Sequence, residues 1–215
     1  MNRLLCLAGA AMCCAFLTTC GTVRAINDDY AADYIIRDIS PLAGVSGAQV
    51  TFQAAVCVTA GSRPLDDPEN PPQWIWNFGG GAEPNVSYEA EPQVTLRDGL
   101  RGPYECTLNL RDGCDDKYLV SATFTLNVAP LTVLDVAPMT GVQNGSAVFS
   151  VVVGSGNVTE YVWDFGGACT PGGSNVANPS VAFKAPGTYE CSVIVSNDFE
   201  ALSFPFTLTV LPESL

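Results

Sequence analysis

Hydrophobic and polar residues alternate one by one over several short stretches of the chain. In residues 50–56, Val50, Phe52, Ala54 and Val56 are apolar, whereas residues 51 and 53 are polar. Residues 149–153 and 189–195 follow the same period of two, which is typical of a strand with one buried face. Clusters of Gly, Pro, Asn and Asp separate these stretches. The pattern therefore predicts an all-β chain built as an antiparallel sandwich.

The N-terminus differs from the rest, because a short positive start is followed by a continuous apolar run over residues 4–17. Such a run is short for a bilayer span and is typical of a signal peptide. It can end in two ways. Residues 17–21 resemble the lipobox of bacterial lipoproteins, in which Cys20 would carry the lipid, whereas Val23-Arg24-Ala25 suits ordinary cleavage after Ala25. We expect a leader over 1–25 and an acidic tether over 26–37, and both endings place the protein outside the cytoplasm.

The second half of the chain repeats the first. Four blocks recur in the same order: 40–52 with 137–149, 75–81 with 162–168, 102–106 with 187–191, and 124–128 with 206–210. Self-similarity of this kind indicates tandem copies of one domain. The first copy is expected over 38–129 and the second over 131–211.

The motifs within each copy carry a family resemblance. Residues 163–167 read Trp-Asp-Phe-Gly-Gly, and residues 187–189 read Gly-Thr-Tyr; together they resemble the PKD (polycystic kidney disease) domain. The usual family motif is Trp-Asp-Phe-Gly-Asp-Gly. Both copies have Gly in place of its second Asp, and the first copy also has Asn77 in place of the first.

The resemblance implies two tandem immunoglobulin-like (PKD-like) sandwiches. It places Trp76 and Trp163 on a central strand inside the core, and it makes Tyr104 and Tyr189 tyrosine corners. The Gly-Gly pairs would form the turn after the tryptophan strand, where positive φ is needed.

Charge and composition exclude several function classes. The chain has 9 Lys and Arg against 22 Asp and Glu, a formal net charge of -13, and no His. Such a surface repels nucleic acid and anionic lipid, so we expect no nucleic-acid partner and membrane contact only through a lipid anchor. Without His, neither a Ser-His-Asp triad nor a His-ligated zinc site can form. The acidic residues are scattered over loops, so we expect no enzyme.

Two acidic loops are candidates for a metal site. An insertion at 62–72 belongs to the first copy alone, and in an immunoglobulin-like topology it lies at the same end as the loop 112–116. Four carboxylates from these loops could bind calcium, which prefers several oxygen ligands: Asp66, Asp67, Asp115 and Asp116. The alternative is a pair of solvated loops without metal, and no other cofactor is expected.

Five cysteines remain beyond Cys20 in what would be an oxidising compartment. In the topology that the resemblance implies, Cys57 and Cys114 meet at one end, and Cys169 and Cys191 at the other. We therefore predict these two disulfides, with Cys106 left as a buried thiol. The rival pairing joins Cys57 to Cys106, as in antibody domains, and the alternation of residues 51–57 disfavours it.

These features favour a non-catalytic interaction or spacer protein, secreted or held at the outer cell surface. Its partner would be a protein or a glycan. The alternative is a carbohydrate-binding accessory module of a secreted degradative system, and Trp74 is the aromatic residue that would stack on a sugar. Because Trp74 shares the face of Trp76, a core or rim position is the simpler interpretation.

Overall fold

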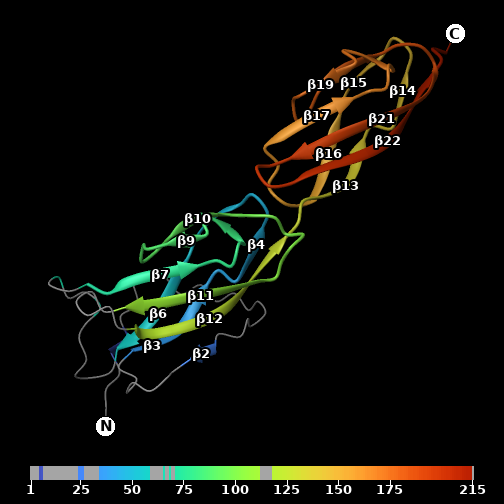
Figure 1. Cartoon of the computed structure of the whole chain (residues 1–215). Coiled ribbons are helices and arrows are strands. Elements are labelled where there is room, and N and C mark those ends of the chain that lie inside the picture. The colour runs from blue at the N-terminus through green and yellow to red at the C-terminus, as the bar shows by residue number, and fades with distance from the viewer. Residues whose placement is uncertain are drawn as a thin grey trace. The chain divides into compact units, whose positions relative to one another are not determined.

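The computed structural model describes residues 34–58, 71–111 and 118–214, the short strands at 5–6 and 24–26, and single residues 65 and 68. The regular secondary structure of these residues consists of strands, in agreement with the predicted all-β class. Within the same residues there is no helix that is long and apolar enough to cross a membrane. The chain divides into two compact units (Figure 1): Met1–Gly44 with Gln49–Val128, and Val45–Ala48 with Ala129–Leu215.

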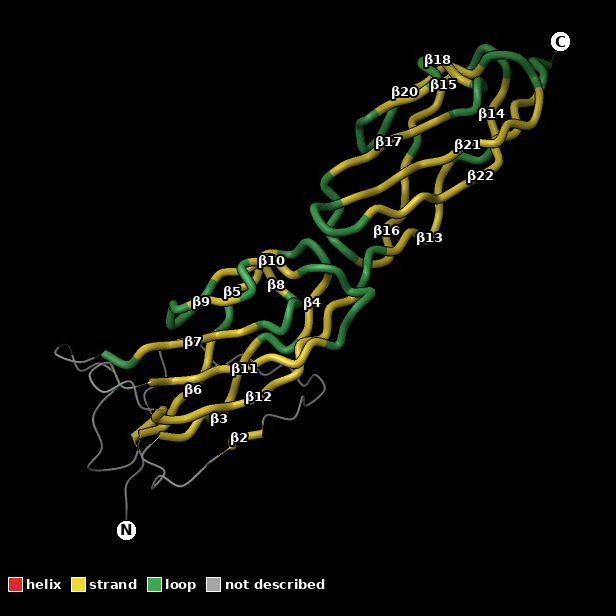
Figure 2. The backbone as a smooth tube through the Cα atoms, in the orientation of Figure 1, coloured by secondary structure: helices red, strands yellow, loops and turns green. Residues whose placement is uncertain are grey.

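The first unit contains two layers of strands (Figure 2). In one layer, β3 (Tyr34–Ser40) pairs with β6 (Gln53–Val58), and β5 (Gln49–Thr51) pairs with β10 (Gln93–Leu96), which pairs with β8 (Ala82–Glu83). The other layer has the order β12 (Tyr118–Ala129), β11 (Tyr104–Arg111), β7 (Gln73–Asn77) and β9 (Val86–Ser87), with β4 (Ala43–Val45) also on β12. Two N-terminal strands join these layers: β1 (Leu5–Cys6) pairs with β6, and β2 (Arg24–Ile26) pairs with β12.

The second unit repeats this arrangement. One layer pairs β13 (Thr132–Ala137) with β16 (Ser150–Ser155), and β15 (Ser146–Val148) with β20 (Ser180–Phe183), which pairs with β18 (Cys169–Thr170). The other has the order β14 (Thr140–Val142), β22 (Ala201–Leu211), β21 (Gly187–Ser196), β17 (Glu160–Asp164) and β19 (Gly173–Ser174). The register is repeated as well, since Trp76 lies opposite Leu108 and Trp163 opposite Val193. Each unit is therefore an immunoglobulin-like sandwich, as the sequence predicts, and its strand pairs are mainly antiparallel, with β14 parallel to β22 in the second unit.

Each core is built around the tryptophan of the central strand. Trp76 is 0% exposed and Trp163 is 2% exposed. Trp76 stacks on Phe78 with ring centroids 6.0 Å apart, and Trp163 stacks on Phe165 at 5.8 Å. Such aromatic contacts add stability beyond the burial of apolar area. The core position that the resemblance implied for both tryptophans is thus confirmed.

The first sandwich begins earlier than the repeat predicts. Strand β3 starts at Tyr34, within the segment expected as a tether, rather than at Asp38. Tyr34 and Ile36 are buried in the core and lie opposite Val58 and Val56. These two apolar residues alternate with partly buried or exposed neighbours, so the strand forms for the same reason as the others.

Candidate functional site

The turn after each tryptophan strand has nearly the same geometry in both units. Gly79 and Gly166 have φ values of 62° and 58°. A Cβ atom on Gly79 would lie 2.2 Å from the carbonyl oxygen of Glu105, and one on Gly166 would lie 2.1 Å from that of Glu190. Only glycine fits such a position, because it allows both the positive φ and the close backbone approach.

An oxygen acceptor from the preceding strand holds each turn. The Gly79 N–H donates to Asn77 Oδ1 and the Gly166 N–H donates to Asp164 Oδ1, both at 2.9 Å. Asn and Asp side chains stabilise turns in this way. The replacement of the family Asp by Asn77 therefore keeps the oxygen atom on which the turn depends.

The second family Asp is replaced by Gly80 in the first unit and by Gly167 in the second. Their φ values are 91° and 85°, and a Cβ atom would have no neighbour within 4 Å at either position. The Gly80 N–H donates to Asn85 Oδ1 at 2.6 Å. Among the described residues, no group of three or more His, Cys, Asp or Glu side chains is placed to hold a metal ion.

The indole N–H of each core tryptophan donates a hydrogen bond to a backbone carbonyl. Trp76 Nε1 donates to Glu89 O and Trp163 Nε1 donates to Val176 O, both at 3.0 Å and both 13 residues downstream. Buried polar groups need such partners. The same hydrogen bond therefore recurs at the core tryptophan of both units.

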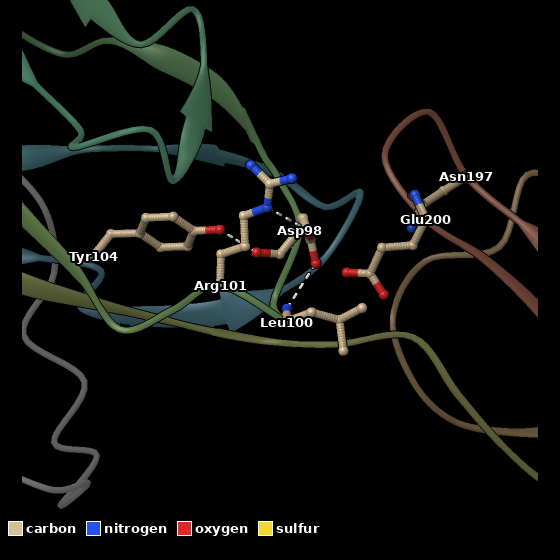
Figure 3. Close-up of polar contacts among 6 residues, drawn as sticks. All are labelled: Asp98, Leu100, Arg101, Tyr104, Asn197 and Glu200. Atoms are coloured by element: carbon tan, nitrogen blue, oxygen red, sulfur yellow. Dashed lines mark hydrogen bonds and ion pairs between the residues drawn. The ribbon is translucent and has the colours of Figure 1, made fainter.

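The tyrosine corners implied by the resemblance are present in both units. The hydroxyl of Tyr189 donates to Ala185 O at 2.9 Å, and that of Tyr104 donates to Asp98 O. Figure 3 shows the Tyr104 ring directed at this loop, where the Asp98 carboxylate accepts the Leu100 N–H at 2.7 Å and pairs with Arg101 at 3.6 Å. A hydroxyl that reaches back to the backbone upstream is the hallmark of the immunoglobulin-like corner.

The cysteines follow the sequence prediction in part. Cys106 is a buried free thiol, as predicted, and burial raises its pKa to about 12. Cys57 takes part in a disulfide. Since Cys106 is free, the antibody-type pairing of these two residues is wrong. Cys114, the predicted partner of Cys57, lies outside the described residues.

Cys169 and Cys191 are free buried thiols in the structure, rather than the disulfide predicted between them. Burial raises the pKa of Cys191 to about 11, and the nearby Cys169 adds to the rise. Burial also raises the pKa of Cys169, against the effect of Lys184. Each thiol stays protonated at neutral pH, and the protonated form is a poor nucleophile.

The remaining predicted site residues are not among those that the structure describes. Asp66, Asp67, Asp115 and Asp116 fall outside the described residues, and so does Cys20. The calcium site and the lipid attachment therefore stay predictions.

Trp74 occupies a rim position. It is half-buried, packs against the core of the first unit and stacks on Trp76 with ring centroids 6.4 Å apart and planes inclined by 9°. This agrees with the simpler of the two interpretations. A ring that already stacks on a core tryptophan offers less of its surface to a sugar.

An apolar pair on the second unit was missed by the motif analysis. Val162 on β17 and Ile194 on β21 lie directly opposite each other, 47% and 39% exposed. Side chains that face each other across two strands interact. The alternation of residues 160–164 carries the signal, because Trp163 is buried and its two neighbours must face outward.

Comparisons with known proteins found solved structures that are similar to this chain at low sequence identity. No curated protein matches the chain. Three N-terminal domains of the bacteriophage RB49 highly immunogenic outer capsid protein (Hoc) are similar at 15% identity, covering 89% of this chain and 59% of that chain, with a TM-score of 0.45. The N-terminal four Ig domains of Dscam1 isoform 4.44 are similar at 15% identity over 80% of this chain and 43% of that chain, with a TM-score of 0.32.

Tandem Ig repeats of Dlar are similar at 14% identity, over 85% of this chain and all of that chain, with a TM-score of 0.29. The chain spans 59% and 43% of the first two structures. At the level of family, the model of the PKD domain matches residues 133–210, which lie in the second unit and carry the motif that resembles that family.

Proposed function

We propose that this chain is an exported, non-catalytic protein whose tandem sandwiches act as an interaction or spacer module at the cell surface. The observation that carries the proposal is the match of residues 133–210 to the PKD domain, within a chain folded as two immunoglobulin-like sandwiches. Both sandwiches are filled by their own aromatic cores. Such a fold offers loops and strand faces for recognition, and function has to be assigned to those surfaces rather than to the fold.

The first unit is, in this proposal, a second PKD-like copy. It shares with the second unit the glycine turn, the indole bond to a carbonyl 13 residues downstream and the tyrosine corner. Three independent local geometries that recur at matched positions support common descent of the two units. The partner we propose is a protein.

Export rests on the N-terminal sequence. The apolar run over residues 4–17 and the cysteine that follows it support a lipoprotein leader, with Cys20 as the lipidated first residue. In an oxidising compartment the disulfide of Cys57 would be stable, and we keep Cys114 as its proposed partner. Calcium bound by Asp66, Asp67, Asp115 and Asp116 remains part of the proposal for the loops at that end.

The test of export is the mass of the mature N-terminal peptide after expression of the full chain in a bacterium that processes lipoproteins. We expect a diacylated Cys20 and a protein that external protease degrades on intact cells. The matched control is Cys20→Ala, which should lose the lipid and leave the membrane fraction. Cleavage after Ala25 would show a secreted protein in place of a lipid-anchored one. An unprocessed chain in the cytoplasm would refute the proposal.

The test of the interaction role compares ligand classes directly. A glycan array is probed with the labelled full chain and, separately, with the Trp74→Ala variant. We expect no glycan signal above background with either protein. A glycan signal that disappears in Trp74→Ala would contradict the proposal and establish the carbohydrate-binding alternative.

A further inference from the structure

The last strand of each unit in sequence has an outer edge, and the two units differ at this edge. In the first unit this strand is β12, which pairs with β11 on its inner side. In the second unit it is β22, which pairs with β21. The backbone N–H and C=O groups along an outer edge need hydrogen-bond partners, and they accept an additional strand when nothing blocks them.

Pro205 blocks the edge of β22. It lies opposite Ser192 within a continuous β21–β22 pairing. Proline has no N–H and is tolerated in a sheet only where that group would face away from the neighbouring strand. The nitrogen of Pro205 therefore faces the outer edge and removes a donor from it.

The matching position in the first unit is not a proline. Thr123 lies opposite Thr107 on β11, in the register of Pro205 opposite Ser192. It keeps its backbone N–H, which by the same geometry points to the outer edge. Ser121 and Thr123 carry no charge that would repel an incoming strand.

The structure shows a strand at this edge. Residues of β2 pair antiparallel with β12, with Arg24 opposite Thr123, Ala25 opposite Ala122 and Ile26 opposite Ser121. We propose that the outer edge of β12 at Ser121–Thr123 is a strand-binding site whose occupant is the chain's own segment Arg24–Ile26. Pro205 denies the second unit an equivalent site. Recognition of this kind depends on main-chain hydrogen bonds and an extended partner.

The position of the segment links this site to processing. A mature chain that begins at Cys20 keeps all three residues of β2, whereas cleavage after Ala25 leaves only Ile26. The first route keeps the edge occupied, and the second empties it. The site itself depends on neither route, so it can be tested on the unprocessed full chain.

The first experiment measures tryptic cleavage of the Arg24–Ala25 bond in the folded full chain. Thr123→Pro copies the residue that the second unit uses and should release the segment, so we expect cleavage about tenfold faster or more. Thr123→Val is the matched control: it keeps the N–H and should cleave at the wild-type rate. Equal rates for Thr123→Pro and wild type would overturn the proposal.

The second experiment changes the occupant and leaves the sandwich intact. In the full chain, Ile26→Pro removes an N–H that faces β12, because Ile26 lies opposite Ser121 and has the same orientation as Arg24 opposite Thr123. It should speed hydrogen exchange of the Thr123 amide by about tenfold or more while the Leu108 amide in the core stays protected. A Thr123 amide that exchanges equally in both proteins would overturn the proposal. Protection that depends on protein concentration, together with a dimer mass in light scattering, would also overturn it, because the occupant would then be a second copy.

Discussion

Gly79 and Gly166 combine positive φ with a backbone carbonyl where a side chain would begin. The neighbouring Gly80 and Gly167 also have positive φ, but a side chain on them would meet no atom within 4 Å. The two glycines of each pair therefore serve different purposes. The first permits the close approach of the turn to the neighbouring strand, β11 or β21, and the second only permits the turn.

This difference predicts unequal costs for the same substitution. Gly80→Ala should lower the free energy of unfolding by about 1 kcal/mol, the cost of a left-handed conformation for a residue with Cβ. Gly79→Ala adds a clash with the Glu105 carbonyl and should cost about 3 kcal/mol or more. Urea denaturation of both variants measures the difference, and equal midpoints would show that the close approach is not important.

At the residue scale, the sequence motifs were sufficient to locate Trp76, Trp163 and both tyrosine corners. The motif could not show why Asn77 replaces an Asp without loss. The reason is visible only in the hydrogen bond from the Gly79 N–H to the Asn77 side-chain oxygen. A motif records residue types, whereas the turn requires one acceptor atom.

At the scale of strands, neighbouring residues have opposite surroundings. On β21, Val193 is fully buried and Ile194 is 39% exposed. The alternation that predicts the strand also predicts which residue faces the core. Both side chains are β-branched, so their intrinsic preference for a strand is similar.

A pair of threonine substitutions tests this assignment. Val193→Thr buries an unpaired hydroxyl and should lower the free energy of unfolding by about 1–3 kcal/mol. Ile194→Thr changes an exposed position and should stay within about 0.5–1 kcal/mol of wild type. Thermal or urea denaturation provides the comparison, and a larger loss for Ile194→Thr would reverse the assigned face.

The elements that sequence analysis missed lie at the edges. Strand β3 begins at Tyr34, before the expected start of the first copy, and β2 pairs with β12 although it lies outside that copy. Strand β13 is the counterpart of β3 in the second unit, but the matched blocks of sequence begin only at the last residue of β3, and β2 has no counterpart among the described strands of the second unit. The strand-binding edge was likewise hidden, because the role of Pro205 depends on the side to which its nitrogen points.

At the scale of the whole molecule, charge and titration follow from composition. The chain has a net charge of -13, a sequence pI near 4.1 and no His. His is the side chain that ordinarily changes charge between pH 5 and 8. The free thiols of the described residues, by contrast, have pKa values raised by burial above the ordinary value of 9.0.

Stability should therefore be nearly constant from pH 6 to 8 and decrease in alkaline solution. The pKa of Cys106 is about 12 in the folded chain and its ordinary value is 9.0, so the unfolded chain loses this proton first. Its stabilising effect is complete below pH 9 and is lost as the pH rises toward 12. Urea midpoints against pH measure the decrease.

Cys106→Ala separates this thiol from the Lys and Tyr residues that titrate in the same range. The first unit of the Cys106→Ala variant should lose less stability between pH 9 and 11 than the first unit of the wild type. Parallel curves for the two proteins would contradict the assignment.

The cysteines also show where sequence reasoning ends. Placing Cys106 in the core required only strand alternation, and the structure agrees. Pairing Cys169 with Cys191 required the resemblance to place both at the same end of the sandwich. The structure leaves both as buried thiols, because proximity in a topology does not determine whether two sulfur atoms are joined.

The buried Cys106 also allows opening of the first unit to be measured without an added label site. A thiol reagent in solution can reach this sulfur only when the sandwich opens, since Cys106 on β11 is 1% exposed and belongs to the core of the first unit. The rate of labelling at neutral pH then counts opening events of that sandwich, without any attached dye or engineered probe. A ligand that binds the first unit would be detected as a slower modification of this single side chain, whatever the chemistry of the ligand.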